Sequence, residues 1–357
     1  MNLKSEKFLF EYLNNASPSG FEINGQKIWL EYLKPFIEEW DSDNYGTVYG
    51  IINPGMEFRV MIEAHADEIG WRVNYINDKG LIYVIRNGGS DHVIAPSKRV
   101  FIHTDEGKQV KGVFGWPAIH TRNGKDNNKH PETDNIFIDI GAETKEDVLK
   151  AGVNIGNPIT FVDNLEKLND NYYVGRALDN RMGGFCIAEV AKKLKENNIS
   201  LPFSLYIVNS VQEEVGLRGA QMITKTIRPH ATIVTDVSHD TTTPMIEKAI
   251  HGEIECGKGP EITFAPSIHN KLLNMVIETA NENQIPYQRS AASRSTGTDT
   301  DAFAYSNGGT PSVLISLPLR YMHTTVEMAH INDINHVIEL IYHSLQKIKP
   351  DMNFKYF

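Results

Sequence analysis

Side chains that can bind a metal ion or transfer a proton follow four apolar stretches of the chain, each of which predicts a β-strand. In chain order these side chains are His65, the adjacent Glu213 and Glu214, Asp236 and His323. Open α/β sheets bind their ligands outside the carboxyl ends of the strands. We therefore expect these side chains to meet at one edge of a sheet. Asp179, in a polar turn that opens a predicted helix, is expected to join them.

The crowding of carboxylates at that edge predicts a metal site. Several carboxylates within a few ångströms repel one another, and a divalent cation reverses this cost. Nitrogen and oxygen ligands of this kind suit zinc, cobalt or manganese. A pair of cations bridged by one carboxylate would use five residues, namely His65, Asp179, Glu214, Asp236 and His323.

Glu213 and Glu214 are expected to have different roles, because adjacent residues at a strand end cannot easily point the same way. One would bind metal, and the other would act as a base toward a water molecule. Asp67 lies two residues beyond His65, on the same side of an extended chain. It is therefore expected to orient the imidazole.

Each of these features alone also has a purely structural interpretation. Asp179 fits a helix N-cap, Asp236 fits the start of a turn, and the glutamate pair fits a solvated corner. The segment 296–299 fits either a substrate-facing loop or a helix cap. No His-Glu-x-x-His motif, nucleophile elbow or phosphate-binding loop occurs in the sequence. The combination of these side chains, each at the end of an element, favours the metal site.

The periodicity of the chain predicts an α/β domain into which a β domain is inserted. Short β-rich runs separated by turns extend from residue 71 to about residue 162, and they predict a small barrel or sandwich. Strands alternate with helices on both sides of this stretch. We expect residues 1–68 and 166–357 to form a sheet covered by helices on both faces, and residues 69–165 to form the insert.

Several boundaries follow from the same patterns. A helix is expected from Glu22 to Glu39, and strands are expected at Ala231–Thr235 and Ser312–Leu317. The almost wholly polar segment Arg122–Asp134 predicts a mobile surface loop within the β-rich stretch.

Composition restricts the possible partners. The chain has 357 residues, with 35 basic and 45 acidic side chains and a net charge of −10, and it has no basic stripe typical of nucleic-acid binding. No run of about 18 apolar residues predicts a membrane span. The cysteines, Cys186 and Cys256, are isolated, which favours a reducing compartment. We expect a cytoplasmic protein without nucleic-acid or membrane partners.

The motifs resemble those of a known family. Residues 64–70, Ala-His-Ala-Asp-Glu-Ile-Gly, resemble the His-x-Asp-Glu-Ile-Gly motif of the M42 metallo-aminopeptidases, the group of the glutamyl and tetrahedral (TET) aminopeptidases. Ala66 departs from the methionine that is common there. Further resemblances occur at Ser17–Gly20, Gly175–Arg181, Gln212–Gly216, Thr235–Asp236 and Tyr321–Thr324.

This resemblance implies a role for each residue of the predicted site. His65 and Asp236 would bind one metal, Glu214 and His323 the other, and Asp179 would bridge them, with zinc or cobalt as the expected ions. Glu213 would be the general base, and Asp67 would support His65. The resemblance also implies a mixed sheet, an inserted β domain used for dimerisation, and dimers that assemble into a hollow tetrahedral dodecamer.

The expected function is the metal-dependent removal of N-terminal residues from peptides. The β-rich stretch lies between His65 and Asp179. The related deacylases and carboxypeptidases resemble the opposite arrangement, in which the extra domain lies in the later gap, here between Asp236 and His323. An N-acyl amino acid deacylase or carboxypeptidase is the first alternative, and a non-catalytic peptide-binding particle is the second. A glycosidase acting through paired carboxylates would leave the histidines unexplained. The preferred N-terminal residue stays open.

Overall fold

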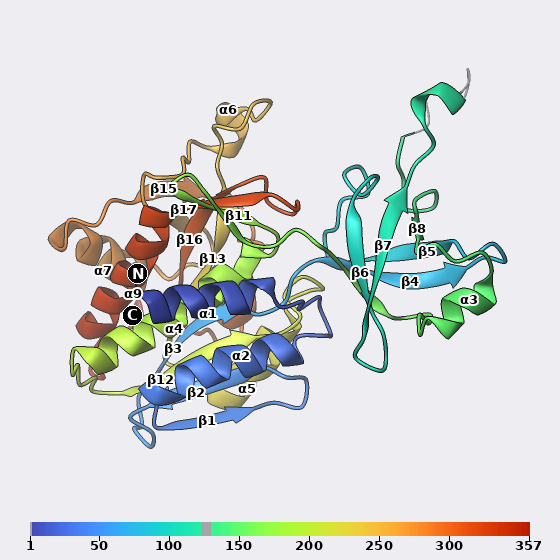
Figure 1. Ribbon diagram of the computed structural model, residues 1–357. Helices are drawn as coiled ribbons and strands as arrows, with labels where there is room; N and C mark the ends of the chain where they lie inside the picture. The colour runs from blue at the N-terminus through green and yellow to red at the C-terminus, as the bar shows by residue number, and fades with distance from the viewer. Residues whose placement is uncertain (1, 123–129) are drawn as a thin grey trace.

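An α/β body and a β-barrel beside it make up the protein (Figure 1). The computed structural model describes residues 2–122 and 130–357. The barrel strands lie in the chain between β3 and β10, which both belong to the sheet of the body. The predicted α/β fold with a barrel-like insert is therefore confirmed.

A mixed sheet runs through the α/β body. Its strands in spatial order are β1 (Glu39–Ser42), β2 (Val48–Ile52), β12 (Ser204–Ser210), β3 (Arg59–His65), β13 (Ala231–His239), β16 (Ser312–Arg320), β17 (Glu327–His330), β11 (Tyr172–Gly175) and β10 (Glu166–Leu168). The central strands β12, β3, β13 and β16 are parallel neighbours. They are rich in Val, Ile and Leu and almost wholly buried, because helices cover both faces of the sheet. β14 (Glu261–Phe264) pairs with β16, and β15 (Gln288–Ala291) pairs with β14.

Helices cover both faces of this sheet. On one face α4 (Leu178–Glu196) contacts α1 (Leu3–Asn14), α2 (Ile23–Leu33) and α9 (Ile331–Lys347). On the other face α5 (Arg218–Ile227) contacts α8 (Asp299–Ala304). Two further helices complete the body, with α7 (Asn270–Glu282) packed on α9 and the short α6 (Lys248–His251) projecting outward (Figure 1).

Antiparallel strands between residues 70 and 161 close into the barrel. Their order around it is β4 (Gly70–Ile76), β5 (Ile82–Asn87), β8 (Phe137–Asp139), β7 (Gln109–Gly115), β6 (Arg99–His103) and β9 (Pro158–Phe161). The helix α3 (Lys145–Lys150) lies near the end of this stretch, and a 3₁₀ turn spans Ile119–Thr121. The barrel has its own hydrophobic core, in which the Trp71 ring lies 5.7 Å from the Phe114 ring.

Some predicted boundaries are wrong. The second helix ends at Leu33 and not at Glu39, since Pro35 lacks an amide hydrogen and lies in a 3₁₀ turn, after which β1 begins at Glu39. β13 continues past Thr235 to His239, so Asp236 lies inside a strand. β16 continues past Leu317 to Arg320, because its pairing with β13 extends to the pair His239–Leu319. The strands β1, β4, β10, β11, β14, β15 and β17 were not predicted individually.

The predicted mobile loop Arg122–Asp134 falls mostly on residues 123–129, which lie outside the described residues. Among the helices of the described residues, none combines the length and the apolar character needed to cross a bilayer.

Candidate metal centre

The carboxyl ends of the central strands bring the predicted residues together. His65 is the last residue of β3 and is 1% exposed. Glu213 and Glu214 follow β12, which pairs in parallel with β3 up to the pair Ser210–His65. Asp236 lies in the neighbouring β13, and His323 follows β16. The predicted convergence at one edge of the sheet is therefore present.

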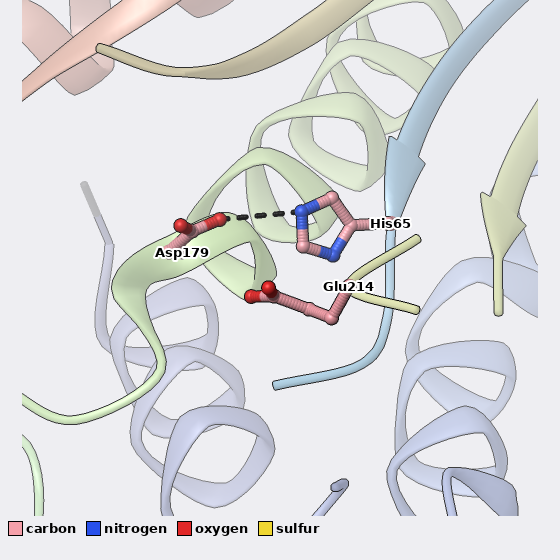
Figure 2. A group of neighbouring side chains, drawn as sticks. All are labelled: His65, Asp179 and Glu214. Atoms are coloured by element: carbon pink, nitrogen blue, oxygen red, sulfur yellow. Dashed lines mark ion pairs between the residues drawn. The ribbon is translucent and has the colours of Figure 1, made fainter. Parts of the chain in front are cut away.

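Asp179 lies between the imidazoles of His65 and His323. Its Oδ1 is 3.2 Å from His65 Nε2, and its Oδ2 is 3.1 Å from His323 Nε2. Figure 2 shows the ion pair with His65 and, close to it, the carboxylate of Glu214. Ligand atoms of His65, Asp179 and Glu214 lie within 4.8 Å of one another, which is a spacing that a metal ion could bridge.

Each imidazole also faces a second carboxylate. Asp236 Oδ1 is 3.7 Å from His65 Nε2, and Glu214 Oε2 is 3.6 Å from His323 Nε2. The structure thus arranges a His65–Asp236 pair and a His323–Glu214 pair on either side of the Asp179 carboxylate.

Glu213 points toward the first of these pairs. Its Oε2 is 3.9 Å from His65 Nε2, whereas the Glu214 carboxylate faces His323. The turn after β12 contains left-handed backbone at Gln212, Gly216 and Leu217. The Glu213 carboxylate therefore faces the His65 imidazole and the Glu214 carboxylate faces that of His323. This agrees with the expectation that adjacent residues at a strand end point in different directions.

Asp67 holds the turn that carries both glutamates. Its Oδ1 accepts the backbone N–H of Glu213 at 3.0 Å, and its Oδ2 accepts that of Glu214 at 3.2 Å. The Ser19 hydroxyl donates to the same Oδ2 at 2.5 Å. Asp67 Oδ1 also lies 3.4 Å from His65 Nδ1. Asp67 therefore positions the Glu213–Glu214 turn as well as the imidazole.

Glu327 was not found from the sequence, and it fixes the other side of the site. It is 2% exposed, and its Oε1 and Oε2 accept the backbone N–H groups of His323 at 2.8 Å and of Asp179 at 3.1 Å. One carboxyl group thus joins segments that are far apart in the sequence. Its sequence signal is weak, since a glutamate four residues after His323 fits a surface strand equally well.

Glu63 was also missed, and Asp299 was singled out only as part of the segment 296–299, without a contact to Glu63 or Ser210. The Ser210 hydroxyl contacts Glu63 Oε1 at 2.5 Å and Asp299 Oδ2 at 2.7 Å, and both acids are buried behind His65. A glutamate inside an otherwise apolar strand, two residues before His65, is the signal that could have revealed this contact.

Glu68, which belongs to the motif at residues 64–70, has a structural role. Glu68 is buried and forms an ion pair with Arg176, while its Oε1 accepts the backbone N–H of Ser17 at 2.7 Å. This contact joins the segment after His65 to the segment before Asp179 and to the N-terminal turn. The motifs at residues 17–20, 64–70 and 175–181 are thus joined through Glu68, which has no direct chemical role in the site.

The electrostatics of the cluster fit a bound cation. Burial raises the pKa of Glu213 to about 10 and that of Glu327 to about 8, since water no longer stabilises the charged forms. Burial also opposes ionisation of Asp179, but the imidazoles of His323 and His65 lower its pKa. Glu214 Oε1 is buried without a hydrogen-bond partner among the described residues. An unpaired carboxylate oxygen in a set of imidazoles and carboxylates fits a divalent metal.

A cavity of about 800 Å³ opens over the cluster. Gly89, in the barrel loop after β5, lines it, and a Cβ added at this glycine would lie 2.5 Å from His323 Nδ1. The segment 296–299 fits both interpretations made from the sequence, since Thr298 caps α8 and also lines the cavity. A larger cavity of about 960 Å³ lies around Arg59 and His230, at the opposite ends of the central strands, and contains none of the predicted site residues.

Comparisons with known proteins agree with the motifs. The sequence profile described as M42 glutamyl aminopeptidase matches residues 46–340. A protein named lysyl aminopeptidase from Pyrococcus furiosus is 33% identical over 341 residues, which cover 95% of this chain and 96% of that protein.

Solved structures are similar over nearly the whole chain. The TET aminopeptidase from Thaumarchaeota archaeon SCGC AB-539-E09 has a TM-score of 0.92 at 30% identity and covers 97% of both chains. The TET1 peptidase of Pyrococcus horikoshii, which can assemble into a tetrahedron or a large octahedral shell, has a TM-score of 0.85 at 26% identity. That match covers 96% of this chain and 100% of the other.

In the metal-free protein, we predict that the free energy of unfolding falls as the pH rises from about 5 to about 9. The folded state keeps protons on Glu327 and Glu213 at pH values where the unfolded chain has lost them, because burial raises both pKa values, to about 8 and about 10. Each such group lowers stability by about 1.4 kcal/mol per pH unit between its unfolded-state and its folded-state pKa, so the contribution of Glu327 ends near pH 8 and that of Glu213 continues to about pH 10.

Urea unfolding of the chelated and the zinc-loaded protein at each pH checks this prediction. Zinc should remove or reverse the slope, because a cation binds ionised carboxylates. A chelated protein whose stability rises with pH over the same range would contradict the electrostatic explanation.

Proposed function

Because this chain belongs to the M42 glutamyl aminopeptidase family and is therefore a peptide hydrolase, we propose that it removes N-terminal residues from peptides in a metal-dependent reaction. The observation that carries the proposal is the Asp179 carboxylate, which lies between the His65–Asp236 and His323–Glu214 pairs. A non-catalytic peptide-binding protein would have no need for this crowding of buried charged groups.

The proposed cofactors are two divalent cations, zinc or cobalt. His65 and Asp236 would hold one, Glu214 and His323 the other, and Asp179 would contribute an oxygen to each. The distances of 3.1 to 3.7 Å within these groups and the unpaired Glu214 Oε1 support this assignment. When bound, such cations polarise the peptide carbonyl and lower the pKa of a water molecule.

Glu213 is the proposed general base. Its carboxylate lines the cavity and forms no hydrogen bond with another described residue, so it is free to accept a proton from the attacking water. It would then pass this proton to the amine that leaves the scissile bond. Asp67 and Glu327 would act as positioning residues, since they bind backbone amides of the segments that carry Glu213, Glu214, Asp179 and His323.

Aminoacyl anilides with a free amine, tested beside the same anilides with an acetylated amine, check the reaction type. The free forms should be hydrolysed, chelation should abolish the activity, and zinc or cobalt should restore it. Preferential hydrolysis of N-acyl amino acids would instead indicate a deacylase, and release of sugars from a glucan would indicate a glycosidase. A metal-loaded protein that binds peptides without cleaving them would contradict any catalytic function.

We predict that Glu213→Gln and Glu214→Gln have opposite effects on metal content. Glu213→Gln removes the basic carboxylate but no ligand, so it should keep its metal while turnover falls by about 10²–10⁴-fold. Glu214→Gln removes a ligand, so it should weaken metal binding. Elemental analysis of both variants beside turnover measures this difference. Loss of metal from Glu213→Gln, with full loading of Glu214→Gln, would reverse the two roles.

The proposed domain division places the α/β domain at residues 1–68 and 166–357 and the insert at residues 69–165. Separate hydrophobic cores in the body and in the barrel support it, and so does β10, which rejoins the main sheet from Glu166. The buried, unpaired cysteines support a reducing compartment, and we propose the cytoplasm, without nucleic-acid or membrane partners.

We further propose that the barrel mediates assembly, through dimers, into a tetrahedral dodecamer. Its outer surface exposes apolar side chains, including Ile85, Val93 and Val113, which suit contact with another copy. Sedimentation of the purified protein should therefore show a particle of twelve chains. A species of 40.2 kDa at micromolar concentration would contradict this assembly.

A further inference from the structure

A row of polar side chains crosses the sheet beside the proposed metal site. Asp236 of β13 is the register partner of Ser316 of β16, and Ser316 is the register partner of Glu261 of β14. Side chains of laterally paired residues project from the same face of a sheet. Glu261 therefore projects from the same face as Asp236, at a distance of two strand spacings, or about 10 Å. All three residues line the catalytic cavity.

Glu261 is held in place by hydroxyl groups. Thr263 donates to its Oε1 at 3.1 Å, and Ser290 donates to the same oxygen. Both donors also line the cavity, and Glu261 is 7% exposed. Its Oε2 accepts no hydrogen bond from any residue that the structure describes. A carboxylate that faces the cavity with one oxygen free of protein donors can accept a positive partner, which a substrate could provide.

The charges of the residues that line the cavity favour a substrate with a cationic side chain. Of the described residues that line it, none is Lys or Arg, and the carboxylates are Asp179, Glu213, Glu214, Asp236, Glu261 and Asp301. Four of these belong to the proposed metal and base positions. Asp301 is used locally, since its Oδ2 accepts the backbone N–H groups of Thr296 and Gly297. Glu261 is thus the cavity carboxylate, among the described residues, that has no role in the metal site or in the loop.

The distance to Glu261 suits a long side chain. A lysine side chain reaches about 6 Å from its Cα to its ammonium group, and an arginine side chain reaches slightly further. An N-terminal residue whose scissile carbonyl lies near Asp236 could therefore bring a terminal cation to Glu261. An aliphatic side chain would leave the carboxylate without a partner, and an acidic one would be repelled.

We propose that Glu261 is a specificity-determining residue that binds the cationic side chain of an N-terminal lysine or arginine, with Thr263 and Ser290 holding its carboxylate in position. This inference rests on the proposed aminopeptidase function. It names the class of substrate that the same cavity accepts.

Lysyl and norleucyl anilides form a matched pair of substrates, because they have stems of similar length and differ in the terminal ammonium group. The wild-type protein should show a higher kcat/KM for the lysyl substrate. Glu261→Gln should lower this kcat/KM by about 10–100-fold, mainly through KM, since it removes a charge-assisted hydrogen bond. The norleucyl substrate should change by less than about threefold, and metal content should stay the same.

Charge reversal and a surface control sharpen the test. Glu261→Lys should shift the preference from lysyl toward glutamyl anilides. Glu282→Gln makes the same change in charge at a side chain that is 62% exposed, and it should leave the ratio of lysyl to norleucyl activity unchanged.

The possible results separate this inference from the function on which it rests. If no anilide with a free amine is hydrolysed by the metal-loaded wild type, the aminopeptidase proposal fails. If such anilides are hydrolysed but lysyl and norleucyl substrates are treated alike, only the role of Glu261 is overturned. Equal losses on both substrates in Glu261→Gln, or loss of metal, would likewise show a structural role and overturn the proposal.

Discussion

Repulsion between carboxylates crowded at one edge of the sheet is the constraint on which the rest of the structure depends. Parallel strands bring their carboxyl ends to this edge, and the chain places an acidic or imidazole side chain after or near the end of each one. Helices on both faces exclude water, so the charged forms lose their hydration. The imidazoles of His65 and His323 offset part of this cost beside Asp179. A bound cation would offset more of it, which makes metal binding and stability of the fold interdependent.

The geometry of the site is fixed largely through backbone amides. Asp67 accepts the amides of the Glu213–Glu214 turn, and Glu327 accepts those of Asp179 and His323. These bonds satisfy buried N–H groups and set the direction of the side chains that follow them. The side chains that face the cavity are therefore held by acids that lie behind them and that share the same low-dielectric surroundings.

Much of this site could be predicted from the sequence, because its residues follow strongly apolar strands. His65, Glu213, Glu214 and His323 lie where that pattern predicts. Glu327 could not be predicted, since its importance comes from contacts with residues distant in the sequence. Strand ends depend on neighbours in the same way, so β13 extends beyond Asp236 as far as β16 pairs with it. The strand β17 was missed because its short sequence has little periodicity of its own.

The order along the chain of the segments that form the candidate metal site has a consequence for biosynthesis. Asp179 is flanked by imidazoles from β3, near the start of the chain, and from the turn after β16, near its end. Glu327, which fixes both Asp179 and His323, comes later still. A ribosome must therefore synthesise the chain through residue 327 before these groups can meet. A translation product that ends before residue 327 lacks the assembled cluster, so N-terminal fragments would lack any activity that depends on it.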